Sequence, residues 1–534
     1  MKVNVEENIA FLQNLINEAE GGYEVYKESF KALQNSYVLE STDLKSLHKR
    51  NKSSLYIPKI NAKVKHVISS LNDVYFNSER MADIEGYINS DQKIIELWQK
   101  ALDFYSNHLN LFKIFQGIFL DAILIGTSVA KVVWHKGAPR IEKVDIDSVY
   151  FDPNAILSDD ISYIINKIYL NFHEIEKRMH NGIYKKENIK DFFDKNNPYK
   201  KFLIYDIYQK DKEDNWSVST LFESILLRFE VFLEDGQPFI WGSMMPSLKR
   251  IEKEGFVCAY GESIMASALN LQNEINLTRN ILMDSVRTHV NPKLILPKSA
   301  GISREDLETV GKPLYAEEPR AVQVLPQPNI SSAVGHLQLL ETELTEVTGI
   351  SPQNNGAQAV KNETATEISI KAQEGGRRVA DYIRQFNETF MEPLFDRFAK
   401  LVYKYGDNVF FDGFDREDMP SFRFKIQTAT GTMNKEVRRA ALNSSMQVLS
   451  AIYQMHMSLG DMNGAYNILE SCKNIGKEIM NISGIKNANE LLDSKNNMGQ
   501  VMQNQALKQE SPMYQNVDEE AVKRLIMENL INAN

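Results

Sequence analysis

Residues that could perform catalysis occur in this chain, but none stands at the spacing that a known reaction needs. His173-Glu174 begins the pattern HExxH, in which two histidines one helical turn apart hold zinc, but residue 177 is Lys. Ser263 follows Gly261-Glu262 as in a nucleophile elbow, but residue 265 is Met where that turn needs glycine. We therefore expect neither zinc-dependent nor serine-dependent hydrolysis.

Glycine and aspartate spacings argue against nucleotide and metal sites as well. No two of the 26 glycines are separated by a single residue, so a GxGxxG dinucleotide fingerprint cannot exist. The Gly-Lys pairs at 311–312 and 476–477 lack the upstream glycine of a phosphate-binding loop. Asp412, Asp415 and Asp418 do not alternate as the ligands of a calcium loop do. The sequence predicts no cofactor, no metal and no enzymatic activity.

Composition describes an ordinary large globular protein. The chain has 534 residues, 61 Lys and Arg, 71 Asp and Glu, a net charge of −10 and 43% hydrophobic residues. This length predicts about three or four folding units. The distant Cys258 and Cys472 argue against a disulfide framework and favour a reducing compartment. The polar, acidic N-terminal residues predict no secretory signal, and the apolar stretch 114–130 is too broken to span a bilayer. The acidic balance excludes a protein that coats DNA, because such coating needs surplus cations.

The elements that would have to position any functional residue are mixed, with helices in the majority. Residues 1–130 show the helical period, and the apolar helix Leu111–Ile125 should be buried. An α+β section built on short antiparallel strands should then extend to about residue 245. Its turns are predicted at Asp214-Asn215 and Asp235-Gly236. The expected strands are Val129–Trp134, Arg140–Phe151, Leu203–Gln209, Trp216–Phe222 and Leu226–Leu233.

The middle of the chain predicts two helices joined by a small β-α-β head. A nearly heptad pattern begins after Gly261, and Asn291-Pro292 should end that helix by Val290. Strands are expected at 293–296 and 321–325, around a short helix that Ser303 begins. A second helix, 330–348, should stop at Gly349. The apolar positions of the first helix are Ile264, Ala268, Leu271, Ile275 and Leu282.

A polar loop, a long bent helix and a helical C-terminal region complete the chain. Residues 350–362 carry Pro352 and Asn354-Asn355-Gly356 and no hydrophobic period, which indicates a loop. Thr364-Ala-Thr-Glu367 is a capping box that should open a helix to Tyr405, bent at Gly375-Gly376 and Pro393. Residues 410–428 predict a strand, and the pattern is helical again from Asn434.

This order of elements resembles the portal (head-to-tail connector) proteins of tailed bacteriophages, particularly those with short tails. Local strings support the resemblance over roughly residues 50–430. They are Val149-Tyr-Phe-Asp-Pro153, Pro238-Phe239 through Gly242 and Pro246, Tyr260-Gly261-Glu262-Ser263, Leu271-Gln272-Asn273-Glu274-Ile275-Asn276 and Asn362-Glu-Thr-Ala-Thr-Glu367. Each string is common by itself, and their order within the stalk, head and loop is the more specific signal.

The resemblance implies an α+β, mostly helical portal fold. Its parts would be a wing (1–261), a first stem helix (262–291), a clip (292–328), a second stem helix (329–348), a channel loop (349–363), a long bent wing helix with strands (364–433) and a helical crown (434–534). In that family, twelve copies form a ring around a DNA channel at one capsid vertex of the virion. The implied partners are further copies of the chain, double-stranded DNA, the large terminase, a tail adaptor protein, and the major capsid protein and scaffold, with assembly in the host cytoplasm and no membrane.

Site residues follow from the resemblance. The channel loop would present mostly amides and one cation to passing DNA: Gln353, Asn354, Asn355, Gln358, Lys361 and Asn362. Amides exchange weak contacts with phosphates, so the lining would have low friction. The stem residues Ile264, Ala268, Leu271, Ile275 and Leu282 would pack between adjacent subunits. Clip residues would serve a partner or, equally well, the neighbouring subunit: Arg304, Lys312, Leu314, Tyr315, Glu317 and Glu318.

Two other classes of protein compete with this interpretation. One is a minor capsid or scaffold-binding protein that assembles without conducting DNA. The other is an enzyme of unrecognised type whose long helices form a substrate site, which the motif search disfavours. An acidic net charge is compatible with a DNA conduit, because strong attraction would stall sliding.

Overall fold

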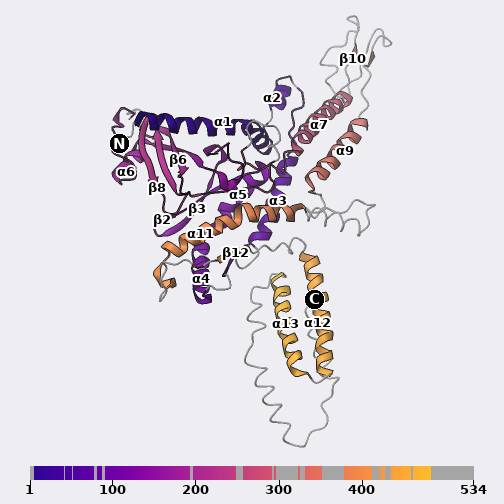
Figure 1. Ribbon diagram of the computed structural model, residues 1–534. Helices are drawn as coiled ribbons and strands as arrows, with labels where there is room; N and C mark the ends of the chain where they lie inside the picture. The colour runs from indigo at the N-terminus through magenta and orange to yellow at the C-terminus, as the bar shows by residue number, and fades with distance from the viewer. Residues whose placement is uncertain are drawn as a thin grey trace, which may run out of the picture. The chain divides into compact units, whose positions relative to one another are not determined.

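A computed structural model shows how these elements are arranged (Figure 1). It describes residues 5–40, 42–50, 52–76, 81–86, 91–192, 197–247, 257–290, 294–295, 323–324, 331–350, 378–411, 420, 422–426, 435–458 and 461–482. The chain divides into two compact units, Met1–Met433 and Asn434–Asn534.

Helices and antiparallel sheets share the first unit, as an α+β fold predicts. Its strands form sheets of order β3-β2-β9 and β4-β5-β6-β7-β8, with two-stranded pairs β1-β12 and β10-β11. The described helices are α1 (Val5–Tyr37), α2 (Thr42–Lys49), α3 (Lys59–Phe76), α4 (Gln92–His108), α5 (Leu111–Leu124), α6 (Phe172–His180), α7 (Ala268–Val290), α9 (Ser331–Thr348) and α11 (Glu392–Tyr405). The strands are β1 (Ala82–Gly86), β2 (Ser128–His135), β3 (Ala138–Val144), β4 (Val149–Phe151), β5 (Tyr163–Asn171), β6 (Lys201–Lys210), β7 (Trp216–Phe222), β8 (Ile225–Phe232), β9 (Phe239–Gly242), β10 (Leu294–Ile295), β11 (Gln323–Val324) and β12 (Phe422–Ile426).

One predicted strand, Arg140–Phe151, is divided between two sheets. Strand β3 ends at Val144, a 3-10 turn covers Ile146–Ser148, and β4 begins at Val149. β3 pairs with β2, whereas β4 pairs with β5. The chain has to change direction to pass from one sheet to the other, and the turn does this while the Ile146 side chain stays buried. A continuous strand was therefore the wrong prediction for this segment.

Three hydrophobic cores lie among the described residues of the unit, and two of them are large. The larger core joins α3, α4 and α5 to α11, and its largest fully buried side chain is Trp98, whose indole donates to the Ala399 carbonyl at 3.0 Å. The second core lies between α1 and the five-stranded sheet, where Tyr23 and Tyr26 each pack edge to face against Tyr260. Aromatic pairs of this kind add about 0.5–1.5 kcal/mol each beyond their burial.

The long helix that precedes β12 is interrupted by a π-helical turn next to Pro393, whereas the predicted bend at Gly375-Gly376 and the capping box at 364–367 lie outside the described residues. Residues 378–386 are α-helical, Asn387–Met391 form a π-helical turn, and α11 continues from Glu392. Proline lacks the N–H that an α-helix would need here, and the wider turn absorbs the mismatch. Thr389 in this turn exchanges hydrogen bonds with the Ser243 backbone at 3.0 and 3.2 Å. The chain beyond α11 departs from prediction, because residues 408–411 form a 3-10 turn and the strand begins only at Phe422.

The second unit is a helical hairpin in its described part. Helices α12 (Lys435–Ser458) and α13 (Met462–Ile482) are joined at Asp461, which accepts from the Gly464 amide at 3.0 Å and pairs with His456 at 2.9 Å. The helical prediction for this region is confirmed as far as residue 482. The predicted last helix, 519–530, lies outside the described residues.

Candidate functional site: a paired-helix stalk and its anchors

Helices α7 and α9 lie side by side and form the predicted stalk (Figure 1). Glu274 on α7 and His336 on α9 meet at 3.0 Å, while Leu282, Leu340 and Leu344 are buried. Beyond the helices, β10 and β11 pair antiparallel with Leu294 opposite Val324, as the two predicted head strands should. The α9 helix ends at Thr348, where Gly349 adopts a φ of 67° that favours glycine.

The approach to α7 is fastened by the Tyr260-Gly261-Glu262-Ser263 string. The Gly261 amide donates to Thr127 Oγ1 at 2.9 Å, and Ser263 Oγ donates to the Ile123 carbonyl at 3.1 Å. A Cβ on Gly261 would stand 2.2 Å from that of Ser243, so only glycine fits. These contacts hold residues 261–265 out of the helix, and α7 begins at Ala268 rather than at the predicted 262.

A ladder of side chains on α7 holds the extended segment that leads from α2 to α3. Each rung accepts a backbone N–H of that segment. The pairs are Asp284 with Ser53 at 2.9 Å, Asn280 with Leu55 at 2.7 Å, Asn276 with Ile57 at 2.9 Å and Gln272 with Ile60 at 3.0 Å. Gln272 and Asn280 also donate to the carbonyls of Ile57 and Leu55, at 2.7 and 2.8 Å.

We call the side chains of Gln272, Asn276, Asn280 and Asp284 the amide ladder, although Asp284 contributes a carboxylate. Simple geometry explains their spacing. Four residues of helix rise about 6.0 Å, and two residues of extended chain advance about 6.6 Å. Side chains spaced by four on the helix therefore meet every second N–H of an extended neighbour, as at Ser53, Leu55 and Ile57. The fourth partner, Ile60, comes three residues later, in the first turn of α3. Gln272, Asn276 and Asn280 are nearly fully buried, so each amide replaces water as the partner of the backbone.

Basic side chains anchor the chain where it leaves α9. Lys63 on α3 donates to the Ile350 carbonyl at 2.6 Å, and Lys59 pairs with Glu341 at 2.7 Å. Arg378 donates to the Glu346 carbonyl at 2.9 Å, which brings the described residues on either side of 351–377 together. Cations at the carboxyl end of a helix are also favoured by its dipole. Burial lowers the pKa of the Lys63 amine to about 8, and neighbouring Lys59 adds to this effect.

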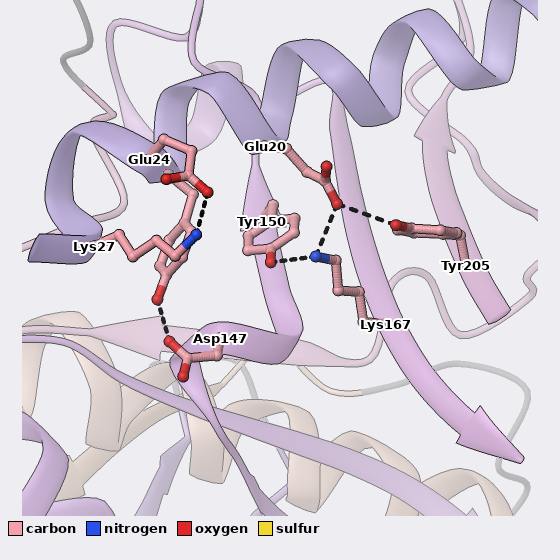
Figure 2. A network of polar contacts seen from close by, with 8 residues as sticks. Glu20, Glu24, Lys27, Asp147, Tyr150, Lys167 and Tyr205 are labelled. Carbon is pink, nitrogen blue, oxygen red and sulfur yellow. Dashed lines mark hydrogen bonds and ion pairs between the residues drawn. The ribbon is translucent and has the colours of Figure 1, made fainter. Parts of the chain in front are cut away.

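A separate polar network fixes α1 to the five-stranded sheet (Figure 2). Lys167 on β5 pairs with Glu20 at 2.8 Å and donates to Tyr150 Oη at 2.5 Å. Tyr205 on β6 donates to the same Glu20 carboxylate at 3.1 Å, and Tyr23 donates to Asp147. Burial by itself would lower the pKa of Lys167, but its contacts with Glu20 and Tyr150 raise it above the usual value.

This network stabilises the packing of α1 against the sheet. Burial and, for Tyr23, the bond to Asp147 raise the pKa values of Tyr23 and Tyr150, so both hydroxyls stay protonated. A cavity of about 390 Å³ lies beside these groups. None of the side chains is poised as a nucleophile beside a base, so the arrangement joins elements rather than reacting.

The predicted stem residues lie in the described structure. Ala268, Ile275 and Leu282 of α7 and the preceding Ile264 are buried, and Leu271 is half-buried against the larger core. Their proposed packing between subunits stays a prediction. All of the predicted channel-loop residues and clip docking residues lie outside the described residues, so their roles stay predictions as well.

The amide ladder was missed by sequence reasoning, although a signal existed. Gln, Asn, Asn and Asp recur at intervals of four from 272 to 284, which indicates a stripe of amide and carboxylate side chains along one face of a helix. The partners of that stripe, more than 200 residues away, leave no local trace. The anchors Lys63 and Arg378 likewise carry no sequence signal.

Comparison with known proteins decides the family. The family model described as phage SU10 portal protein matches residues 191–528, which is more than half of the chain. The chain belongs to this phage portal protein family. A search of curated proteins found no match.

As a portal protein of a tailed phage, the chain belongs to a structural family. Within the described residues, no group of three or more His, Cys, Asp and Glu side chains could hold a metal ion. None of the described helices is long and apolar enough to cross a membrane.

Proposed function

We propose that this portal protein assembles into a ring, with twelve copies as the expected number, that conducts double-stranded DNA through one capsid vertex. The observation that carries the proposal is the family match over residues 191–528, which includes the α7–α9 stalk. In this proposal the DNA is packaged and later ejected through the ring, and β10 and β11 begin and end a clip that binds the terminase and then the tail adaptor.

An apolar face left open on the stalk supports assembly with further copies. Leu277 and Ile281 on α7 are 51% and 55% exposed, and Leu339 on α9 is 54% exposed. Side chains of this kind on adjacent paired helices suit burial against the same elements of a neighbour. The wing, stem, clip, loop and crown boundaries given above are part of this proposal.

The stalk anchors support a role in holding the channel loop. Lys63 and Arg378 bind backbone carbonyls at the end of α9, so the residues that flank segment 351–377 are fixed to the body. A rigid base suits a loop that must touch moving DNA without following it. The proposed lining is polar, and Lys361 is its cation.

Imaging of the purified full-length protein tests the proposal. Negative-stain class averages should show closed rings with a central hole, and mass photometry should give one oligomer. Rings without a hole would favour the minor capsid protein that does not conduct DNA, and a monomer at high concentration would contradict ring assembly.

A charge reversal tests conduction separately from assembly. Lys361→Glu should leave rings intact but alter DNA packaging or retention, because it places a negative charge where phosphates pass. Lys185→Glu changes the same charge on an exposed part of the body and serves as the matched control. Normal packaging and retention in Lys361→Glu would contradict the lining role.

A further inference from the structure

One stretch of this acidic chain concentrates positive charge. Residues 44–72 contain seven Lys and Arg and no Asp or Glu, although 71 acidic residues in 534 correspond to about four in a stretch of this length. Two of the cations, Lys59 and Lys63, are engaged in fixing α9. The others include a group on and just after α2, and all of its members are exposed: Lys45, Lys49, Arg50 and Lys52.

The end of α7 adds to this group. The amide ladder places Ser53 at 2.9 Å from Asp284, so the chain after α2 lies against the last turns of α7. Arg287 is exposed there, 3.6 Å from Asp284. Burial raises the pKa of the Asp284 carboxyl, but hydrogen bonds from Ser53 and the nearby charges of Arg287 and Lys52 lower it overall. We call Lys45, Lys49, Arg50, Lys52 and Arg287 the α2 basic surface.

Local groups neutralise only part of this charge. Glu40 pairs with Lys45 at 3.2 Å, and Asp284 offsets one more cation. The carboxyl ends of α2 and α7 contribute about half a negative charge each. Asp43 of α2 is a further acidic residue, so a surplus of about one positive charge per subunit remains, and within the described residues neither Lys49 nor Arg50 has a carboxylate partner.

We propose that the α2 basic surface binds the phosphate backbone of double-stranded DNA, with Lys49 and Arg50 as its principal contacts. Exposed Lys and Arg without carboxylate partners are the groups that displace counterions from DNA. In the described part of α2, residues 44–49, the exposed side chains are cationic or polar, whereas a protein interface needs apolar or aromatic anchors at its centre. Two unpaired cations give weak, salt-sensitive contact without sequence preference.

This contact goes beyond the proposed channel lining, since it uses a surface outside segment 349–363. It also does not need the ring, because every cation in it belongs to one chain.

The salt dependence of DNA binding tests the proposal on the full-length protein. The variant is Lys49→Gln with Arg50→Gln, and the matched control is Lys185→Gln with Lys186→Gln, two exposed lysines at a distance in sequence from α2. Fluorescence anisotropy of a labelled 30-base-pair duplex would be measured between 50 and 200 mM KCl. Loss of two phosphate contacts lowers the slope of log K against log salt by about 1.8, so the wild type should lose about 12-fold more affinity than the variant over this range.

Each possible result either supports or contradicts DNA binding by the α2 basic surface. A control that behaves like the wild type beside a variant with a shallower slope supports the proposal. Equal slopes in the variant and the wild type, or no DNA binding by the wild type at 50 mM KCl, would overturn it. Binding of a poly-glutamate peptide that depends on Lys49 and Arg50 while DNA binding does not would assign the surface to an acidic protein. Imaging of the same samples reports on rings independently, so failure of the channel and failure of this surface can be distinguished.

Discussion

Replacing Asn280 with alanine should release the segment around Leu55 from helix α7. The Asn280 side chain is 1% exposed and makes three hydrogen bonds in the amide ladder. It accepts from the Leu55 N–H at 2.7 Å and donates to the carbonyls of Leu55 at 2.8 Å and of Asn276 at 2.7 Å. Alanine removes all three bonds while keeping the helix propensity high.

The size of the effect follows from those bonds. A typical hydrogen bond contributes about 0.5–1.5 kcal/mol net, so three contribute about 1.5–4.5 kcal/mol. Leu55 is half-exposed, and water can partly replace the amide. We therefore expect the free energy of local opening to fall by about 2–3 kcal/mol, which corresponds to about 30-fold to 150-fold faster amide exchange.

Hydrogen–deuterium exchange of peptides that cover residues 52–60 measures this directly. Ser285→Ala is the matched control, because among the described residues the Ser285 hydroxyl bonds only to the Ile281 carbonyl of its own helix, at 2.9 Å. The control should leave exchange in 52–60 unchanged. Asn280→Asp keeps the acceptor and loses both donors, so it should also accelerate exchange in 52–60. It serves as a second test in case the alanine substitution perturbs α7 itself.

Unchanged exchange in both Asn280 variants would refute the reasoning. It would mean that the extended segment is held by hydrophobic contacts and that the ladder adds nothing measurable. Acceleration spread equally over peptides from α7 and from distant sheets would also contradict it, because that pattern indicates global destabilisation.

Three further predictions follow from single residues. Gly261→Ala should lower the thermal unfolding midpoint by several degrees, because its new methyl group would stand 2.2 Å from Ser243 Cβ. Differential scanning fluorimetry measures this midpoint. An unchanged midpoint would show that the backbone before α7 shifts to accommodate the methyl group at no cost in stability. Burial raises the pKa of the Cys258 thiol to about 11, so in a Cys472→Ser background Cys258 should react with a disulfide reagent at pH 8 at least about tenfold more slowly than a free thiol, and an equal rate would contradict the burial. Burial raises the pKa of the Asp121 carboxyl to about 6, above its unfolded value near 4, so the stability that its protonation contributes is present below pH 4 and lost as the pH rises through 6. Asp121→Asn should therefore gain about 2–3 kcal/mol relative to the wild type between pH 4 and pH 7 in denaturant unfolding, and a pH-independent difference would exclude this linkage.

Local patterns determined much of the chain's organisation. Apolar period and stop signals predicted α5, the end of α7 at Val290 and the end of α9 before Gly349, because these depend on residues within one or two turns. The turn at Asp214 has a φ of 62° and that at Gly236 a φ of 70°, as short polar residues and glycine permit. The order of these elements was sufficient to indicate the portal family that the comparison then showed.

The tertiary structure decided what depends on distant contacts. The break in 140–151 exists because two sheets compete for one segment, and alternation alone cannot show that competition. Asn280 and Leu55 lie 225 positions apart. Lys63 and Arg378 also bind partners that no local sequence pattern reveals. The sequence by itself therefore determined the types and order of the elements through short-range propensity and period. Only the folded chain determined which polar groups fasten the stalk, because a buried hydrogen bond takes its partner from whatever the packing brings within reach.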